Sequence, residues 1–210
     1  GEVESERRVA MHAQMDFAKL RRRTSGILAR ELRSEGEGSG RVVRAFLGGV
    51  TKCGDICRFD TVEELCPRVY ALCDSAGLGN EMLQTIAQAA QEKRFDVIIC
   101  PNSDRPEECQ HVLIPERGLA FVTTNARMLY EGKPYRRLRL DAMAEGRLTR
   151  AQKAKLRFIR RVETSLLEEA VRTLTDAANA HDTLEAVYRP CIDFSGVTAL
   201  AEEEIARLIK

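Results

Sequence analysis

The amino-acid sequence predicts an α/β domain, with a mainly parallel sheet flanked by helices, followed by a long C-terminal helical arm. Two observations carry this prediction. Between residues 41 and 123, short runs of apolar and β-branched residues surround a helical segment, as expected for strands buried on both faces of a sheet. From Thr149 onward, apolar residues instead recur at intervals of three and four, which is the pattern of an amphipathic helix.

Composition restricts the classes of partner. The 210 residues include 33 basic and 32 acidic side chains, a net charge of +1, so the chain lacks the positive field that favours nucleic-acid binding. No apolar run approaches the roughly 18 residues of a membrane span, and the charged residues 1–8 lack the apolar core of a signal peptide. Seven cysteines without regular spacing fit a reducing compartment. We therefore expect a cytoplasmic protein that binds neither membranes nor nucleic acid.

The sequence predicts no metal site. Cys53, Cys57 and Cys66 are close in sequence, but no second pair and no nearby histidine completes four zinc ligands. His181 and Glu185 stand one helical turn apart, a spacing that suits a metal ion. Because His181 also lies on an apolar stripe, a packed histidine is the preferred interpretation.

The two ends of the chain resemble each other. Residues 15–20 (MDFAKL) match residues 192–197 (IDFSGV), and Leu32 matches Ile209 at the same offset. Each copy is predicted to be an amphipathic helix capped by its Asp. Such a repeat predicts that residues 1–33 are the helical tail of an upstream module. The alternative is two unrelated helices that share an Asp-Phe start.

Residues 34–40 (SEGEGSG) are predicted to be a flexible linker, and the α/β core follows over residues 41–146. A helix at residues 81–93 separates the second and third of four candidate strands. These strands are residues 41–47, 69–73, 96–100 and 119–123. The order predicts a βαβ unit with parallel strands and a right-handed crossover.

Residues 147–210 are predicted to form the helical arm and a closing helix. The apolar stripe ends at Pro190, and Asp193 begins the last helix. About forty residues is long for one globular helix, so we expect the arm to pack as a helical hairpin or a coiled coil. A homodimer through this arm is one such arrangement.

The segment from Val69 to Met82 has the layout of a phosphate-binding loop. An apolar strand leads into a loop that contains Gly77 and Gly79, and a helix follows. A functional loop reads G-x-x-x-x-G-K-[ST], in which the lysine meets the β- and γ-phosphates and the hydroxyl binds Mg²⁺. Here Asn80 and Glu81 occupy those two positions.

In this loop and the segments around it, the chain resembles the second module of a family of uncharacterised bacterial proteins built from two tandem P-loop ATPase modules. The likeness covers residue 9 to the end. It implies a P-loop NTPase-like fold with degenerate Walker A and Walker B motifs, and an upstream P-loop module as partner. The matching segments are residues 41–49 (RVVRAFLGG), 70–91, 95–100, 111–122 (HVLIPERGLAFV), 181–188 and 192–195.

The departures from that family define a vestigial nucleotide site. Asp74 replaces the first loop glycine, and Asn80, Glu81 and Met82 stand where the lysine and the hydroxyl residues are expected. The second acidic signal of the family falls on Thr123. The resemblance thus implies a site made of Asp74, Gly77, Gly79, Asn80, Glu81, Met82 and Thr123.

We interpret this site as filled by the protein itself. A bound triphosphate requires the loop N–H groups, the helix dipole, the lysine charge and Mg²⁺, whereas Asp74 and Glu81 place carboxylates in the same region. The expected function is a non-catalytic scaffold or regulatory partner of an upstream ATPase module, with no cofactor. In the alternative, the chain is an ATP-binding enzyme, an ATPase or kinase-like protein, in which Asn80 replaces the lysine and Glu81 holds Mg²⁺.

Overall fold

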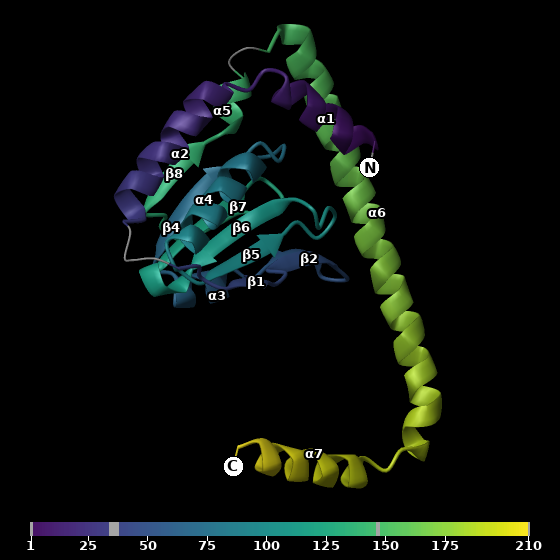
Figure 1. Cartoon of the computed structure of the whole chain (residues 1–210). Helices are drawn as coiled ribbons and strands as arrows, with labels where there is room; N and C mark the ends of the chain where they lie inside the picture. Colours follow the sequence, from purple (N-terminus) through teal and green to yellow (C-terminus); the bar gives the residue numbers. More distant parts are fainter. Residues whose placement is uncertain (1, 34–37, 146–147, 210) are drawn as a thin grey trace.

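The computed structural model describes residues 2–33, 38–145 and 148–209. It consists of an α/β core and a helical arm that leaves it (Figure 1). The predicted fold class is confirmed at this level, because a mostly parallel six-stranded sheet is flanked by helices and followed by a helix of 39 residues. Of the predicted linker, residues 34–37 lie outside the described residues, and Gly40 donates its N–H to the carbonyl oxygen of Gln91 at 2.8 Å.

The sheet has the strand order β1-β5-β6-β7-β4-β8. β1 pairs in parallel with β5, and β4 pairs in parallel with both β7 and β8, whereas β6 runs antiparallel to its two neighbours. A separate antiparallel hairpin joins β2 and β3. The strands are β1 (Val42–Arg44), β2 (Gly48–Thr51), β3 (Gly54–Cys57), β4 (Arg68–Cys73), β5 (Val97–Pro101), β6 (Cys109–Ile114), β7 (Leu119–Thr124) and β8 (Arg136–Arg139).

The two parallel strands of the expected βαβ unit are not neighbours in the sheet. β4, α4 (Asn80–Glu92) and β5 follow one another along the chain, but β7 and β6 lie between β4 and β5 in the sheet. After β5 the chain turns back and pairs with it as the antiparallel strand β6, a strand that was not predicted. The predicted strand at residues 41–47 is also too long, because β1 ends at Arg44 and the hairpin begins at Gly48. A Cβ at Gly48 would lie 1.9 Å from the Ile56 carbonyl oxygen, so only glycine fits there.

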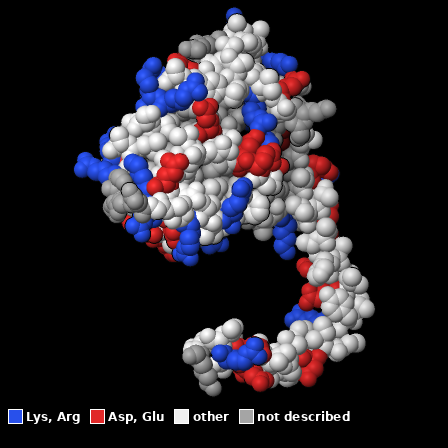
Figure 2. All heavy atoms as spheres, viewed as in Figure 1, with Lys and Arg blue, Asp and Glu red and all other residues white. Residues whose placement is uncertain are grey.

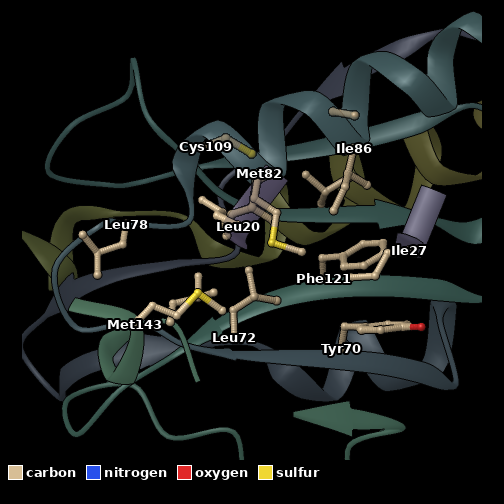
Figure 3. Close-up of a cluster of buried hydrophobic side chains, with 14 of the residues drawn as sticks. Leu20, Ile27, Tyr70, Leu72, Leu78, Met82, Ile86, Cys109, Phe121 and Met143 are labelled. Carbon is tan, nitrogen blue, oxygen red and sulfur yellow. The ribbon is translucent and has the colours of Figure 1, made fainter. Parts of the chain in front are cut away.

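Alternation along the strands gives the sheet two apolar faces. The face that contains Leu72 and Phe121 is covered by α4 and by α2 (Phe17–Glu31), and part of this cluster is drawn in Figure 3. The opposite face, which contains Ala71, is covered by α3 (Phe59–Leu65). Shorter helical segments are α5 (Asp141–Glu145) and the 3₁₀ turns η1 (Pro115–Arg117) and η2 (Arg189–Cys191).

The helix α2 packs on the core of this same chain. It begins at the predicted cap, where Asp16 accepts a hydrogen bond from the Lys19 N–H at 2.9 Å. Leu20, Ile27 and Leu32 are each at most 4% exposed and belong to the core cluster beneath α4. Most of the segment predicted to be an upstream tail therefore contributes directly to the stability of the described domain.

One buried carboxylate anchors the end of α2 to the sheet. Glu31 accepts a hydrogen bond from the Tyr70 hydroxyl at 2.5 Å and pairs with Arg68 at 2.9 Å, and both partners lie on β4. Burial alone would raise the pKa of Glu31. The hydrogen bonds from Tyr70 and Arg30 and the charge of Arg68 outweigh burial, so the pKa lies below its ordinary value.

The long helix α6 (Arg150–Tyr188) begins and ends close to the predicted positions. Thr149 caps it through a capping box with Gln152. Its first half packs against α1 (Glu2–His12), and Arg7 of α1 pairs with Glu163 at 3.1 Å. The arm is thus joined to the core through its beginning.

The second half of α6 leaves the core (Figure 1). Early in this half, the Thr175 hydroxyl still contacts the core, donating to the Lys52 carbonyl oxygen at 3.1 Å. After the turn at Pro190, α7 (Phe194–Leu208) begins at the predicted cap Asp193 and has no buried residue. Within this chain, α6 thus packs against α1 over its first half, and a coiled coil between two copies stays a prediction. Among the described residues, no helix is both long and apolar enough for a membrane span.

Candidate functional site

The predicted site lies at the edge of the sheet where the parallel strands β4 and β7 end. Cys73 and Thr124 are paired there, next to Thr123. The Asp74 N–H then donates to the Thr124 carbonyl oxygen at 3.1 Å. This carboxyl edge is where open α/β sheets bind ligands. The structure thus brings the loop after β4 beside the end of β7.

The Asp74 carboxylate occupies the centre of the loop. One oxygen accepts hydrogen bonds from the backbone N–H groups of Ala76 at 3.1 Å and Leu78 at 2.9 Å, and the other accepts from Gly79 at 2.7 Å. The residue is 3% exposed. In a phosphate-binding loop, such N–H groups face the phosphates. Here an internal carboxylate holds them instead.

A second carboxylate, which the sequence did not indicate, completes this arrangement. Asp141, at the start of α5, accepts from the Ser75 N–H at 3.0 Å and from the Ser75 hydroxyl at 3.1 Å. Asp141 follows β8, an edge strand beside β4. Its position could not be read from the loop sequence, because sixty-six residues separate the partners.

The two loop glycines are favoured for different reasons. Gly77 has a φ of +69°, a left-handed conformation that side chains other than glycine rarely adopt. Gly79 is crowded, since an added Cβ would lie 3.1 Å from an Asp74 carboxylate oxygen and 3.0 Å from Leu140. The glycine pattern therefore serves a loop that closes tightly around its own aspartate.

The remaining predicted residues at the start of α4 point in three directions. The Asn80 side-chain oxygen accepts from the Cys109 N–H at 2.9 Å and ties α4 to β6. Glu81 pairs with Arg21 of α2 at 3.3 Å and is half-exposed. Met82 is buried in the core. Glu81 therefore does not fill the loop, and the carboxylates that bind its N–H groups are those of Asp74 and Asp141.

A pocket of about 660 Å³ lies beside the loop, between the carboxyl edge of the sheet and α6. Asp74, Gly77, Asn80 and Thr123 are among its lining residues, whereas Gly79, Glu81 and Met82 are not. Its volume suits a small-molecule ligand. Five arginines contribute to its walls, namely Arg7, Arg105, Arg127, Arg137 and Arg160.

Carboxylates neutralise several of these arginines. Besides the pairing of Arg7 described above, Arg105 pairs with Glu108 and Arg127 pairs with Asp55, each at 3.0 Å. Basic and acidic side chains are also interspersed over the molecular face drawn in Figure 2. The pocket therefore lacks the concentrated positive charge that a triphosphate requires.

His111 supports the end of β7 from beneath the site. Its Nδ1 accepts a hydrogen bond from the Thr123 N–H at 3.1 Å, and its Nε2 lies 3.9 Å from Cys57 Sγ. Burial lowers the pKa of His111 to about 3. The neutral ring is thus the form that the fold requires, and it positions the end of β7 through Thr123.

Lowering the pH from 7 to 5 is expected to destabilise the protein through His111. The unfolded chain takes up a proton near pH 6.5, while the folded chain stays neutral until about pH 3. Stability is therefore lost as the pH falls below 6.5, by about 2 kcal/mol at pH 5. Urea unfolding of the natural chain and of His111→Gln at both pH values tests this. The substitution should remove that part of the pH dependence, whereas His12→Gln on the surface should retain it.

The other candidate ligands do not form a convincing site. The pKa of Cys57, Cys100 and Cys109 is raised to about 12, mainly by burial. These thiols are therefore unreactive at neutral pH. In the described part of the chain, one group, His181 with Asp182 and Glu185, has ligand atoms within 4.8 Å of one another. The prediction of a packed His181 is wrong, because its side chain is 64% exposed on the free half of α6.

The loop after β4 is therefore held by internal contacts. Asp74 and Asp141 bind its N–H groups, and Asn80 connects its helix to the neighbouring strand. The relationship to tandem P-loop ATPase modules stays a prediction. Comparison of the chain with known protein families, with curated proteins and with solved structures gives no match.

Proposed function

We propose that this chain is a degenerate P-loop NTPase-like module that neither binds nor hydrolyses nucleotide. It acts as a scaffold or regulatory partner of an upstream ATPase module. The observation that carries this proposal is the Asp74 carboxylate, which holds the three N–H groups of Ala76, Leu78 and Gly79. No ligand is needed to satisfy this loop.

The negative charge of the Asp74 carboxylate disfavours phosphate binding by the loop. A phosphate oxygen about 4 Å from a carboxylate is repelled by roughly 4 kcal/mol per pair of unit charges at an effective dielectric constant of about 20. That energy corresponds to a loss of affinity of about 10³-fold. The absent lysine removes the attraction that would offset it.

A second candidate function is an ATP-binding enzyme with an atypical loop. It is favoured by the size of the pocket and by Arg137 and Arg160 in its walls, both of which are exposed. In this case the triphosphate would lie against the arginines and away from the N–H groups of the loop. ATP and Mg²⁺ would then be the cofactors.

Calorimetric titration of Mg-ATP distinguishes the two functions. We compare the natural chain, the double variant Asn80→Lys/Glu81→Ser, and the triple variant that also carries Asp74→Gly. Neither the natural chain nor the double variant should bind, because Asp74 still holds the loop. The triple variant frees the N–H groups and restores the lysine and the hydroxyl, so we expect measurable binding.

Circular dichroism and urea unfolding serve as controls that each variant is folded. Binding of Mg-ATP by the natural chain would overturn the proposal. In that event, loss of binding in Arg137→Ala/Arg160→Ala would assign the nucleotide to the arginine side of the pocket.

A further inference from the structure

The two matching ends of the sequence have the same backbone structure. Asp16 and Asp193 adopt nearly the same conformation, with φ and ψ of −83° and 79° in the first and −80° and 88° in the second. Each side chain accepts from the N–H three residues later, Lys19 at 2.9 Å and Gly196 at 3.1 Å. The repeat is therefore structural as well as sequential.

Backbone hydrogen bonds around the two caps coincide as well. Before the helix, the Met15 N–H donates to His12 in the first copy, and Ile192 donates to Arg189 in the second. At the cap, the corresponding bonds are Leu20 to Asp16 and Val197 to Asp193. At the end of the helix, they are Leu32 to Leu28 and Ile209 to Ile205. Each pair of bonds differs in length by at most 0.2 Å. The two helices therefore have the same length and the same kind of cap.

The environments of the two helices are opposite. Leu20 and Leu32 of the first copy are each 1% exposed beneath α4, whereas their equivalents Val197 and Ile209 are 58% and 79% exposed. Phe194, Ile205 and Leu208 extend the same apolar stripe of α7 into solvent. An amphipathic helix gains its stability from burial of such a stripe.

We propose that α7 is the docking helix for a second module of this fold, which receives α7 in the place that α2 takes here. The α2–α4 interface of this chain is the template for that contact. The inference goes beyond the proposed function, because it rests on the helical repeat alone. Nucleotide binding by this chain would leave it intact.

Two positions define how the partner module differs from this one. Leu208 of α7 corresponds to Glu31 of α2, whose carboxylate accepts a hydrogen bond from Tyr70 in this chain. The partner module should therefore present an apolar side chain at the position that Tyr70 occupies here. Glu204 corresponds to the buried Ile27, so the partner should present a basic or solvated position there. These two differences give specificity between modules. If α2 and α7 exchanged places, Glu31 and Glu204 would each place a carboxylate against an apolar part of the other module's core.

A fusion protein tests the proposal. Residues 1–209 are joined directly to residues 33–210 of a second copy, so that α7 leads into the second core as α2 leads into the first. Hydrogen exchange of the α7 amides should slow relative to the natural chain, by about 100-fold or more where α7 is matched to this core. The further change Val197→Asp in the fusion should abolish this protection.

A second fusion that carries Glu204→Ile and Leu208→Glu accommodates the face of this particular core. Protection of α7 in either fusion, lost with Val197→Asp, supports the proposal. Rapid exchange of α7 in both fusions overturns it. It is also overturned if the natural chain alone dimerises through α7 in sedimentation velocity and Val197→Asp abolishes the dimer, because α7 would then bind a core that already holds its own α2.

Discussion

Replacement of Asp74 by alanine is expected to lower the free energy of unfolding by about 3 to 5 kcal/mol. The change leaves the N–H groups of Ala76, Leu78 and Gly79 without their acceptor in a buried loop. Urea unfolding followed by circular dichroism measures the loss. Asp104→Ala is the matched control, since this exposed carboxylate lies beside the same pocket and should change stability by less than about 0.5 kcal/mol.

The same variant gives a second readout. The vacated N–H groups form an anion site at the start of a helix, so sulfate should stabilise Asp74→Ala more than the natural chain. The difference between the two proteins removes the general effect of sulfate on burial. A variant as stable as the natural chain, and equally responsive to sulfate, would show that the aspartate does not fill the loop.

Leu20→Ala is expected to destabilise the protein by about 2 to 5 kcal/mol, while the equivalent change Val197→Ala alters stability by less than about 0.5 kcal/mol. The two residues occupy the same place in the helical repeat. Only Leu20 is buried, so its truncation leaves a cavity beneath α4. Thermal and urea unfolding of both variants test this pair.

A large loss for Leu20→Ala would establish α2 as part of the folding unit of this chain. If Leu20→Ala had as little effect as Val197→Ala, α2 would not stabilise the core, and residues 1–33 would behave as a detachable tail. Glu31→Gln offers an independent check of the same interface, because it removes the charge that pairs with Arg68.

Local signals in the sequence were sufficient for the ends of several helices, although α3 and α5 were not predicted. Asp16 and Asp193 are caps where the sequence predicts them, the long helix starts after Thr149 as expected, and Pro190 ends α6. A cap depends on bonds within a few residues, so it can be read from a short segment. The apolar runs of β4 and β7 also predict both as strands, but they do not predict that the two strands pair with each other.

Features that depend on distant partners were not predicted. β8 (Arg136–Arg139) looks like a basic loop in sequence, because it is an edge strand with exposed side chains and is defined by backbone pairing to β4. The loop sequence offered two carboxylates, Asp74 and Glu81, and gave no means of choosing between them. The choice depends on the path of the loop backbone and on Arg21, which lies sixty residues from Glu81.

The continuous course of α6 gives the arm the mechanics of a stiff lever. The helix contains neither glycine nor proline over its 39 residues, so no hinge interrupts a length of about 58 Å. About 38 Å of the helix follows Glu163, so a tilt of about 5° at this contact with α1 would displace the far end by about 3 Å. Small rearrangements near Arg7 and Glu163, beside the pocket, would thus reach α7 as movements as large as a small side chain.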